Sequence, residues 1–159
     1  YRNDTWIYYS KGWKKYQNNL NTLSPSRRQS TSCSQLAYFG NGRAILFGGA
    51  KFEFTGTTID SDTWSFTISK GWVQLHPVAS PAPRTAYGLA FLTTSASIVM
   101  YGGGGADRTL VPDTTWIFTN NLEWQRGPEA TTNPTRKRRR GVAARRRRSD
   151  ELFCPAMFL

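Results

Sequence analysis

The chain has 159 residues, a hydrophobic content of 38% and a formal net charge of +11, which fits one domain of ordinary size. No apolar run approaches the roughly 18 residues that span a bilayer, so no transmembrane segment is predicted in this piece. Its 6 Trp, 7 Tyr and 9 Phe, together with 14 Gly and 8 Pro, favour short strands and turns over helices. Because the first residue is Tyr and not Met, a piece of a longer protein is expected.

The positive charge is concentrated near the end of the sequence. Residues 1–133 hold 12 basic and 8 acidic residues, a net +4, whereas residues 134–159 hold 9 and 2, a net +7. The body is therefore mildly basic and is followed by one very basic segment. Only Cys33 and Cys154 are present, so neither a disulfide framework nor a zinc-ligand spacing is indicated.

The first predicted elements form a recognisable series. DTWIYYSKGWKKY, at residues 4–16, contains two short aromatic stretches, each with one tryptophan. A Pro-Arg turn, SPSRR, follows at 24–28. Asn41-Gly42 then separates two apolar segments, which is a hairpin signal. The series closes with AILFGG at 44–49, an apolar run that ends on a glycine pair.

The same order of elements then returns. Residues 62–75 read DTWSFTISKGWVQL, residues 80–84 read SPAPR, residues 98–103 read IVMYGG and residues 113–124 read DTTWIFTNNLEW. All six tryptophans fall into pairs spaced 7, 8 and 8 residues apart, and the first members of the pairs are 58 and 52 residues apart: Trp6/Trp13, Trp64/Trp72 and Trp116/Trp124. The sequence is therefore an internal repeat.

Strand periodicity fits each part of the repeat. Trp64, Phe66 and Ile68 alternate with polar residues, which places them on one face of a strand. Residues 45–47 and 98–101 lack alternation, as expected of a strand buried on both faces. Four short strands in a period of about 50 residues are typical of a propeller blade.

The ordered repetition of Gly-Gly, DTW and a later Trp resembles the kelch repeat over nearly the whole chain. The resemblance implies an all-β fold of about two and a half four-stranded blades, an incomplete fragment of a β-propeller. Residues 1–133 are assigned to kelch repeats, with blade boundaries near 24–28 and 80–84. Since four to eight blades are typical of a closed propeller, further blades or domains are expected outside this piece, and the chain alone is expected to expose a blade face and to associate.

The motif residues have structural roles in this interpretation. The glycines would let the chain leave a buried strand where φ is positive or a Cβ would clash: Gly48, Gly49, Gly102 and Gly103. The tryptophans would supply the apolar area that packs blade against blade: Trp6, Trp13, Trp64, Trp72, Trp116 and Trp124.

The resemblance also implies a non-enzymatic scaffold that binds a partner protein through the loops at one end. Those loops follow each Gly-Gly or hold the Pro-Arg turns, and the candidate contact residues are Arg28, Lys51, Arg84, Asp107 and Arg108. Arginine suits such a surface because it can hold a carboxylate bidentately, so a partner with an acidic segment is expected. The alternative for each of these residues is a solvated loop charge or an arginine that packs the blades.

Residues 134–159 continue the repeat with less regularity. Pro134 arrives where earlier periods have a Pro-Arg turn, 141–144 can form a strand, and 156–159 resembles 44–47. The segment is expected to begin a further blade that is truncated or partly disordered, since Pro155 interrupts its last strand. Its basic run, RKRRRGVAARRRR at 136–148, leaves open an alternative function of unspecific binding to nucleic acid or an anionic surface, as well as proteolytic processing.

Enzymatic chemistry is weakly represented. The chain has one histidine, His76, beside a proline in an expected surface turn. One histidine cannot supply the copper site of the oxidases that some kelch-like propellers resemble. GGGGAD at 102–107 lacks the order of a phosphate-binding loop, and Asp60 and Asp62 fit a turn or strand entry. No catalytic residue, metal or cofactor is therefore predicted.

Overall fold

The computed structural model describes residues 4–16, 31–32, 34–53, 56–105 and 114–128. Within these ranges the protein is all-β, and no described residue is helical. The first strands are β1 Trp6–Tyr9, β2 Gly12–Lys15, β3 Thr31–Ser32, β4 Gln35–Tyr38 and β5 Arg43–Glu53. They are followed by β6 Gly56–Thr67, β7 Gly71–Leu75, β8 Gly88–Leu92, β9 Ser97–Tyr101, β10 Thr115–Phe118 and β11 Trp124–Arg126. The predicted all-β class is confirmed.

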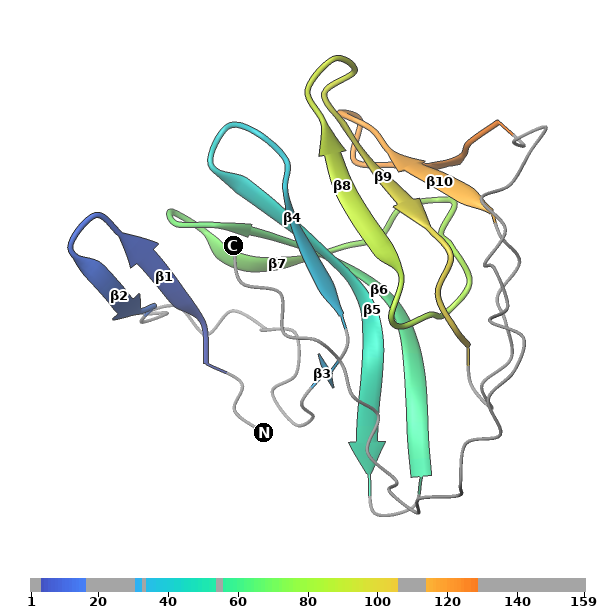
Figure 1. Cartoon of the computed structure of the whole chain (residues 1–159), viewed down its shortest axis with the longest axis horizontal. Coiled ribbons are helices and arrows are strands. Elements are labelled where there is room, and N and C mark those ends of the chain that lie inside the picture. The colour runs from blue at the N-terminus through green and yellow to red at the C-terminus, as the bar shows by residue number, and fades with distance from the viewer. Residues whose placement is uncertain (1–3, 17–30, 33, 54–55, 106–113, 129–159) are drawn as a thin grey trace, which may run out of the picture.

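The strands form three antiparallel sheets that follow one another along the chain (Figure 1). The N-terminal sheet contains β1 and β2. The middle sheet contains β4, β5, β6 and β7, with the short β3 beside the far part of β5. The C-terminal sheet contains β8, β9, β10 and β11 in sequence order. Two four-stranded meanders and one two-stranded sheet make a partial, propeller-like fragment.

The two-stranded sheet, β1 and β2, is therefore the incomplete unit and lies at the start of the described chain. Its two strands match, in sequence, the last two strands of each later sheet, because 4–16 repeats 62–75. The segment 80–84 lies between β7 and β8, where one sheet gives way to the next. The other expected boundary, 24–28, and the expected further blade at 134–159 lie outside the described residues.

The turn at Asn41-Gly42 joins β4 and β5. Asn41 and Gly42 have φ values of 50° and 68°, and the Arg43 amide donates to the Gly40 carbonyl at 2.9 Å. Two central residues with positive φ define a type I′ turn, whose twist matches that of paired strands. The hairpin predicted from the sequence is therefore confirmed.

The middle sheet differs from the sequence prediction in one respect. The stretch between its Gly-Gly and DTW was expected to be a variable loop, but β5 and β6 are 11 and 12 residues long and remain paired out to Glu53 and Gly56. Their register shifts between Phe47 and Gly49, as at a β-bulge. The outer part of this hairpin runs on beyond the other strands (Figure 1).

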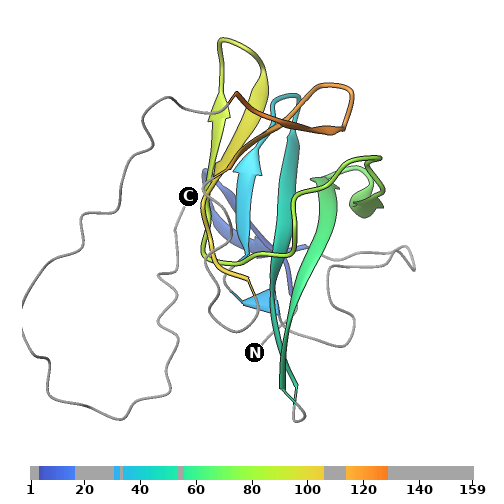
Figure 2. The same ribbon diagram turned by 90° about the vertical axis from the view of Figure 1, so that its right-hand side faces the viewer.

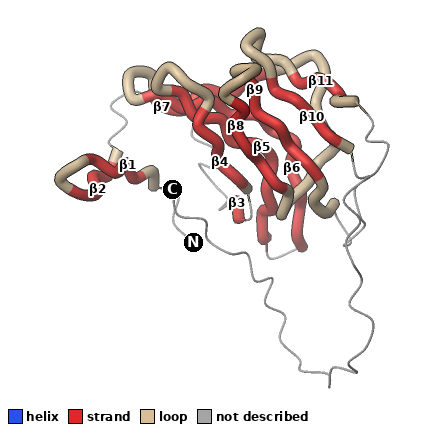
Figure 3. Tube along the Cα trace, turned by 45° about the horizontal axis from the view of Figure 1, so that its top comes forward, coloured by secondary structure: helices blue, strands red, loops and turns tan. Residues whose placement is uncertain are grey.

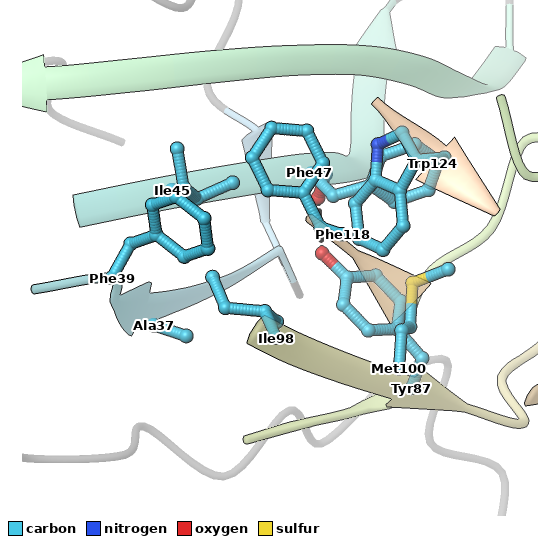
Figure 4. Close-up of a cluster of buried hydrophobic side chains, with 9 residues drawn as sticks. All are labelled: Ala37, Phe39, Ile45, Phe47, Tyr87, Ile98, Met100, Phe118 and Trp124. Atoms are coloured by element: carbon cyan, nitrogen blue, oxygen red, sulfur yellow. Dashed lines mark hydrogen bonds between the residues drawn. The ribbon is translucent and has the colours of Figure 1, made fainter. Parts of the chain in front are cut away.

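The main core lies between the middle and C-terminal sheets (Figure 4). It combines side chains from facing strands of both sheets: Ala37, Phe39, Ile45, Phe47, Tyr87, Ile98, Met100, Phe118 and Trp124. Phe47 contacts Trp124 with ring centroids 5.3 Å apart and Tyr87 with centroids 5.8 Å apart, both edge to face. Such edge-to-face aromatic contacts stabilise the packing of the two sheets beyond the contribution of their buried area.

Candidate functional site

The second tryptophan of each repeat lies opposite an aromatic residue of the neighbouring strand. Trp72 is the register partner of Phe66 and Trp124 is that of Phe118, with ring centroids 5.0 Å apart in both pairs. In the N-terminal sheet Tyr8 and Trp13 are paired in the same way, at 5.3 Å. The tryptophan pairs of the sequence are thus extended by a third aromatic position, two residues after the first Trp.

The same tryptophans bond across the junctions between sheets. The Trp124 indole N–H donates to Thr63 Oγ1 at 3.0 Å, which joins the C-terminal sheet to the middle sheet. The Trp72 indole N–H donates to Thr5 Oγ1 at 2.8 Å, which joins the middle sheet to the N-terminal sheet. Buried indole N–H groups need such a partner. The role predicted for these tryptophans, packing sheet against sheet, agrees with this geometry.

The tryptophans of the N-terminal sheet are different. Trp6 is 49% exposed and Trp13 is 56% exposed, whereas Trp64, Trp72 and Trp124 are all below 10%. The N-terminal sheet meets the middle sheet with its opposite face, through Thr5 and through Tyr16, whose hydroxyl donates to the Ile68 carbonyl at 3.1 Å. The expectation that Trp6 and Trp13 bury apolar area between sheets is therefore not met within the described residues.

The glycine pairs adopt the backbone expected of them. Gly48, Gly49, Gly102 and Gly103 have φ values of 50°, 112°, 71° and 103°, a region that side chains with a Cβ rarely adopt. A Cβ on Gly48 would lie 2.7 Å from the Arg84 carbonyl oxygen and 2.8 Å from that of Asp60. Gly48 and Gly49 therefore allow the register shift within β5, which continues beyond them to Glu53, and Gly48 allows the close approach of the next Pro-Arg turn.

Arg84 joins the two sheets at this edge. Its amide donates to the Asp60 carbonyl at 3.3 Å and its carbonyl accepts from the Gly49 amide at 3.1 Å. Its guanidinium donates through Nε to the Ala82 carbonyl at 3.1 Å and through Nη1 to the Gly102 carbonyl at 3.0 Å. The residue thus binds both glycine-pair strands.

These contacts correct the expectation that Arg84 meets a partner protein. The residue is 1% exposed, so its side chain offers no surface to a partner, and the alternative of an arginine that packs the sheets is the observed one. Burial lowers the pKa of the Arg84 guanidinium, against a smaller opposing influence from Tyr87, but an arginine stays charged at neutral pH.

Tyr87 joins the two larger sheets, a role that was not predicted from the sequence. Its hydroxyl donates to the Phe47 carbonyl and accepts from the Gln35 amide at 3.1 Å. The Gln35 side chain in turn accepts from the Leu89 amide at 3.0 Å. Burial raises the pKa of the Tyr87 phenol, and the two backbone hydrogen bonds oppose this only in part. The neutral phenol therefore belongs to the folded state.

The other predicted contact residues are placed only in part. Lys51 lies on β5 of the long hairpin, where it pairs with Thr58. Arg28, Asp107 and Arg108 lie outside the described residues. Among the described residues at this edge, Gly56, Thr57 and Thr58 at the hairpin end are exposed, as are Ala82 and Pro83 in the Pro-Arg turn.

The outer part of β6 has an open edge. β7 pairs with β6 only from Thr63 to Thr67, and among the described residues Gly56–Asp62 is paired as a strand with β5 alone. Two carbonyls there are already used: that of Asp60 accepts from the Arg84 amide, and that of Ser61 accepts from the Ser80 hydroxyl at 3.4 Å, so the open part of the edge is residues 56–59. An open edge presents backbone N–H and C=O groups that another strand can pair with. Figure 2 shows this hairpin in side view, standing out from the sheets.

Chemistry of other kinds is sparse in the described part of the chain. His76 is exposed in the connection after β7, as expected. The described residues contain no group of three or more His, Cys, Asp or Glu that could hold a metal ion. No described helix has the length and apolar character that a membrane crossing requires.

Together, these features define a class of protein: an all-β chain of successive antiparallel sheets, consistent with part of a β-propeller. In Figure 3 the described part of the chain contains only strands and loops. Among solved structures, that of YjhT is similar, with a TM-score of 0.52 and 15% identity over 75% of this chain and 42% of YjhT. The chain thus spans less than half the length of YjhT, and at this identity the likeness shows the fold alone. No family model and no curated protein matches the chain.

Proposed function

We propose that this chain is a non-enzymatic scaffold of kelch-type blades that binds a partner protein at the edge formed by the glycine pairs. The Gly-Gly and DTW repeats support the family, and the stacked meanders support its fold. The observation that carries the proposal is the long β5–β6 hairpin, which extends past the sheet and leaves the edge of β6 open over residues 56–59.

The open edge suits a partner that adds an extended strand. In such recognition, backbone hydrogen bonds supply affinity and alternate side chains supply specificity. The hairpin base is held firmly, because Arg84 bonds to Asp60 and to Gly49 while its own side chain is buried. Lys51, one of the predicted contact residues, lies on β5 of the same hairpin, and a partner with an acidic segment remains the expectation from the sequence.

A trimmed hairpin tests the proposal. Ala50 and Ile59 are register partners, so residues 51–58 can be replaced by Asn-Gly, a two-residue turn that preserves the pairing. The matched control is Thr94→Glu in the exposed turn between β8 and β9. Both variants and the natural chain are immobilised, and bound proteins are quantified by mass spectrometry.

We expect the natural chain and the control to retain at least one protein in equal amounts. The bound amount of that protein should fall about tenfold with the trimmed hairpin, which corresponds to a loss of about 1.4 kcal/mol of binding free energy. The proposal is wrong for this surface if trimming changes the amount of no bound protein. Binding of duplex DNA with a steep salt dependence, unaffected by trimming, would instead favour the alternative of unspecific binding through 136–148.

A further inference from the structure

The bond between sheets uses the same two sequence positions each time. Thr5 and Thr63 both directly precede the first Trp of a repeat, and Trp72 and Trp124 are both the second Trp. The middle sheet takes part in both bonds. It donates from Trp72 toward the N-terminal sheet and accepts at Thr63 from the C-terminal sheet. Each sheet therefore has a donor face and an acceptor face.

Among the described residues, no sheet covers the donor face of the N-terminal sheet. Trp13 occupies the position of Trp72 and Trp124, but it is 56% exposed where they are 9% and 1% exposed. Beside it, Trp6 is 49% and Tyr8 is 62% exposed. These three aromatic side chains, which we call the Trp13 face, correspond to the buried set around Trp72. No other surface of the described chain gathers two such exposed tryptophans.

The acceptor face of the C-terminal sheet is likewise not covered by another sheet in the described part of the chain. Thr115 precedes Trp116 as Thr63 precedes Trp64, and it pairs with Tyr101 as Thr63 pairs with Phe47. Val99 and Ile117 are register partners on the same side of the sheet, so Tyr101, Thr115, Val99 and Ile117 form one surface, the Thr115 face. All four are only half-buried.

The corresponding face of the middle sheet shows what covers such a surface. There Ile45, Phe47 and Thr63 are at most 1% exposed, because the C-terminal sheet lies against them. The Trp13 face and the Thr115 face are the two halves of that contact, and one chain carries both.

We propose that the chain binds a second copy of itself head to tail, with the Trp13 face of one copy against the Thr115 face of the next. The contact continues the interface that already occurs twice within the chain, and the Trp13 indole N–H would donate to Thr115 Oγ1. Because the two faces differ, the contact is heterologous and produces a closed ring or an open chain of copies.

Variants that block one face at a time test this arrangement by sedimentation equilibrium. Trp13→Ser removes the donor face, and Thr115→Val combined with Ile117→Lys removes the acceptor face. Val78→Ser, at a side chain that is 97% exposed and distant in sequence from both faces, is the control. Far-UV circular dichroism and thermal unfolding check that each variant folds.

We expect the natural chain and the control to associate with the same dissociation constant, and each blocked variant alone to associate at least about tenfold more weakly. An equimolar mixture of the two blocked variants should form a one-to-one complex, since each retains the face that the other lacks. Thr115→Ser, which keeps the hydroxyl, should associate like the natural chain and supplies a readout if the double variant does not fold.

Three results would overturn the proposal. The natural chain could be monomeric at all concentrations, which would mean that other parts of the polypeptide or another protein cover these faces. Either blocked variant could associate as strongly as the control. The mixture could fail to form a complex although both variants fold.

Discussion

The indole N–H of Trp124 donates to Thr63 Oγ1 at 3.0 Å, across the junction between the middle and C-terminal sheets. The two residues are 61 positions apart in the sequence. The pair is buried among Phe47 and Phe118. Thr63, which looks like an ordinary strand residue in the sequence, thus accepts the hydrogen bond of the buried Trp124 indole N–H. The equivalent bond from Trp72 to Thr5 makes this a property of the repeat.

Thr63→Val should therefore destabilise the protein more than a surface threonine substitution does. Valine keeps the shape but leaves the Trp124 N–H buried without an acceptor, for a loss of about 1–3 kcal/mol in the free energy of unfolding. Urea unfolding followed by tryptophan fluorescence measures it. Thr63→Ser should retain most of the stability, and the exposed Thr58→Val should change it by less than about 0.5 kcal/mol. Equal stability of the Val and Ser variants would contradict this role.

Gly48→Ala should be more harmful than Gly102→Ala, although both glycines have positive φ. The φ penalty alone is about 1–2 kcal/mol. At Gly102 a Cβ would meet nothing within 4 Å, whereas at Gly48 it would meet two carbonyl oxygens below 3.0 Å, which adds about 1–3 kcal/mol of overpacking. Comparison of the two urea midpoints tests the order. A larger effect at Gly102 would show that the approach of Arg84 to Gly48 is not a close one.

Stability should fall in alkaline solution, and Tyr87 should contribute to the fall. Burial raises the pKa of its phenol in the folded state, whereas in the unfolded chain the phenol ionises at about pH 10. Its contribution is complete below that pH and decreases as pH rises toward the folded pKa, by up to about 1.4 kcal/mol per pH unit. Tyr87→Phe should flatten the decline of stability above about pH 10 while lowering stability at pH 7. An unchanged alkaline slope in the variant would contradict the assignment.

Arg84→Ala should unfold at a lower urea concentration than the natural chain. The substitution leaves a cavity and removes the donors to the Ala82 and Gly102 carbonyls, a loss on the order of 3 kcal/mol. Lys70→Ala, in the exposed turn between β6 and β7, is the control for removing a positive charge. If both variants unfolded alike, the guanidinium would not be holding the sheets together.

Much of the fold could be predicted because the sequence repeats its own strands. The period of the tryptophans, the alternation of Trp64 and Phe66 and the Asn41-Gly42 turn each predict a local structure that the chain adopts. The prediction is wrong for Ile68, which lies in the exposed turn after β6 and not on the same strand face. The glycine pairs were predictable for the same reason, since an apolar strand that ends in Gly-Gly indicates a backbone closed to other residues. Each of these patterns depends only on the residues of one segment, so the sequence of that segment is enough to predict its conformation.

The candidate site was less predictable because exposure depends on neighbours from distant parts of the chain. Nothing in SPAPR distinguishes an arginine that faces solvent from one that bonds to Gly102, 18 residues later. Trp13 and Trp72 share the same SKGW context, yet only Trp72 is covered. The acceptor role of Thr5 and Thr63 did leave a signal, their fixed place before the first Trp, but that signal has meaning only once two sheets are known to face each other.

The donor and acceptor faces also give the stack a polarity. A sheet inserted in reverse would bring two indole N–H donors together at one junction, where neither would have the threonine acceptor that it needs. A sheet in the right orientation fits between any two neighbours, since its contacts are made by the same Thr and Trp positions. Duplication or loss of a whole repeat can therefore change the number of sheets without requiring a new interface, while the loops at their edges diverge independently.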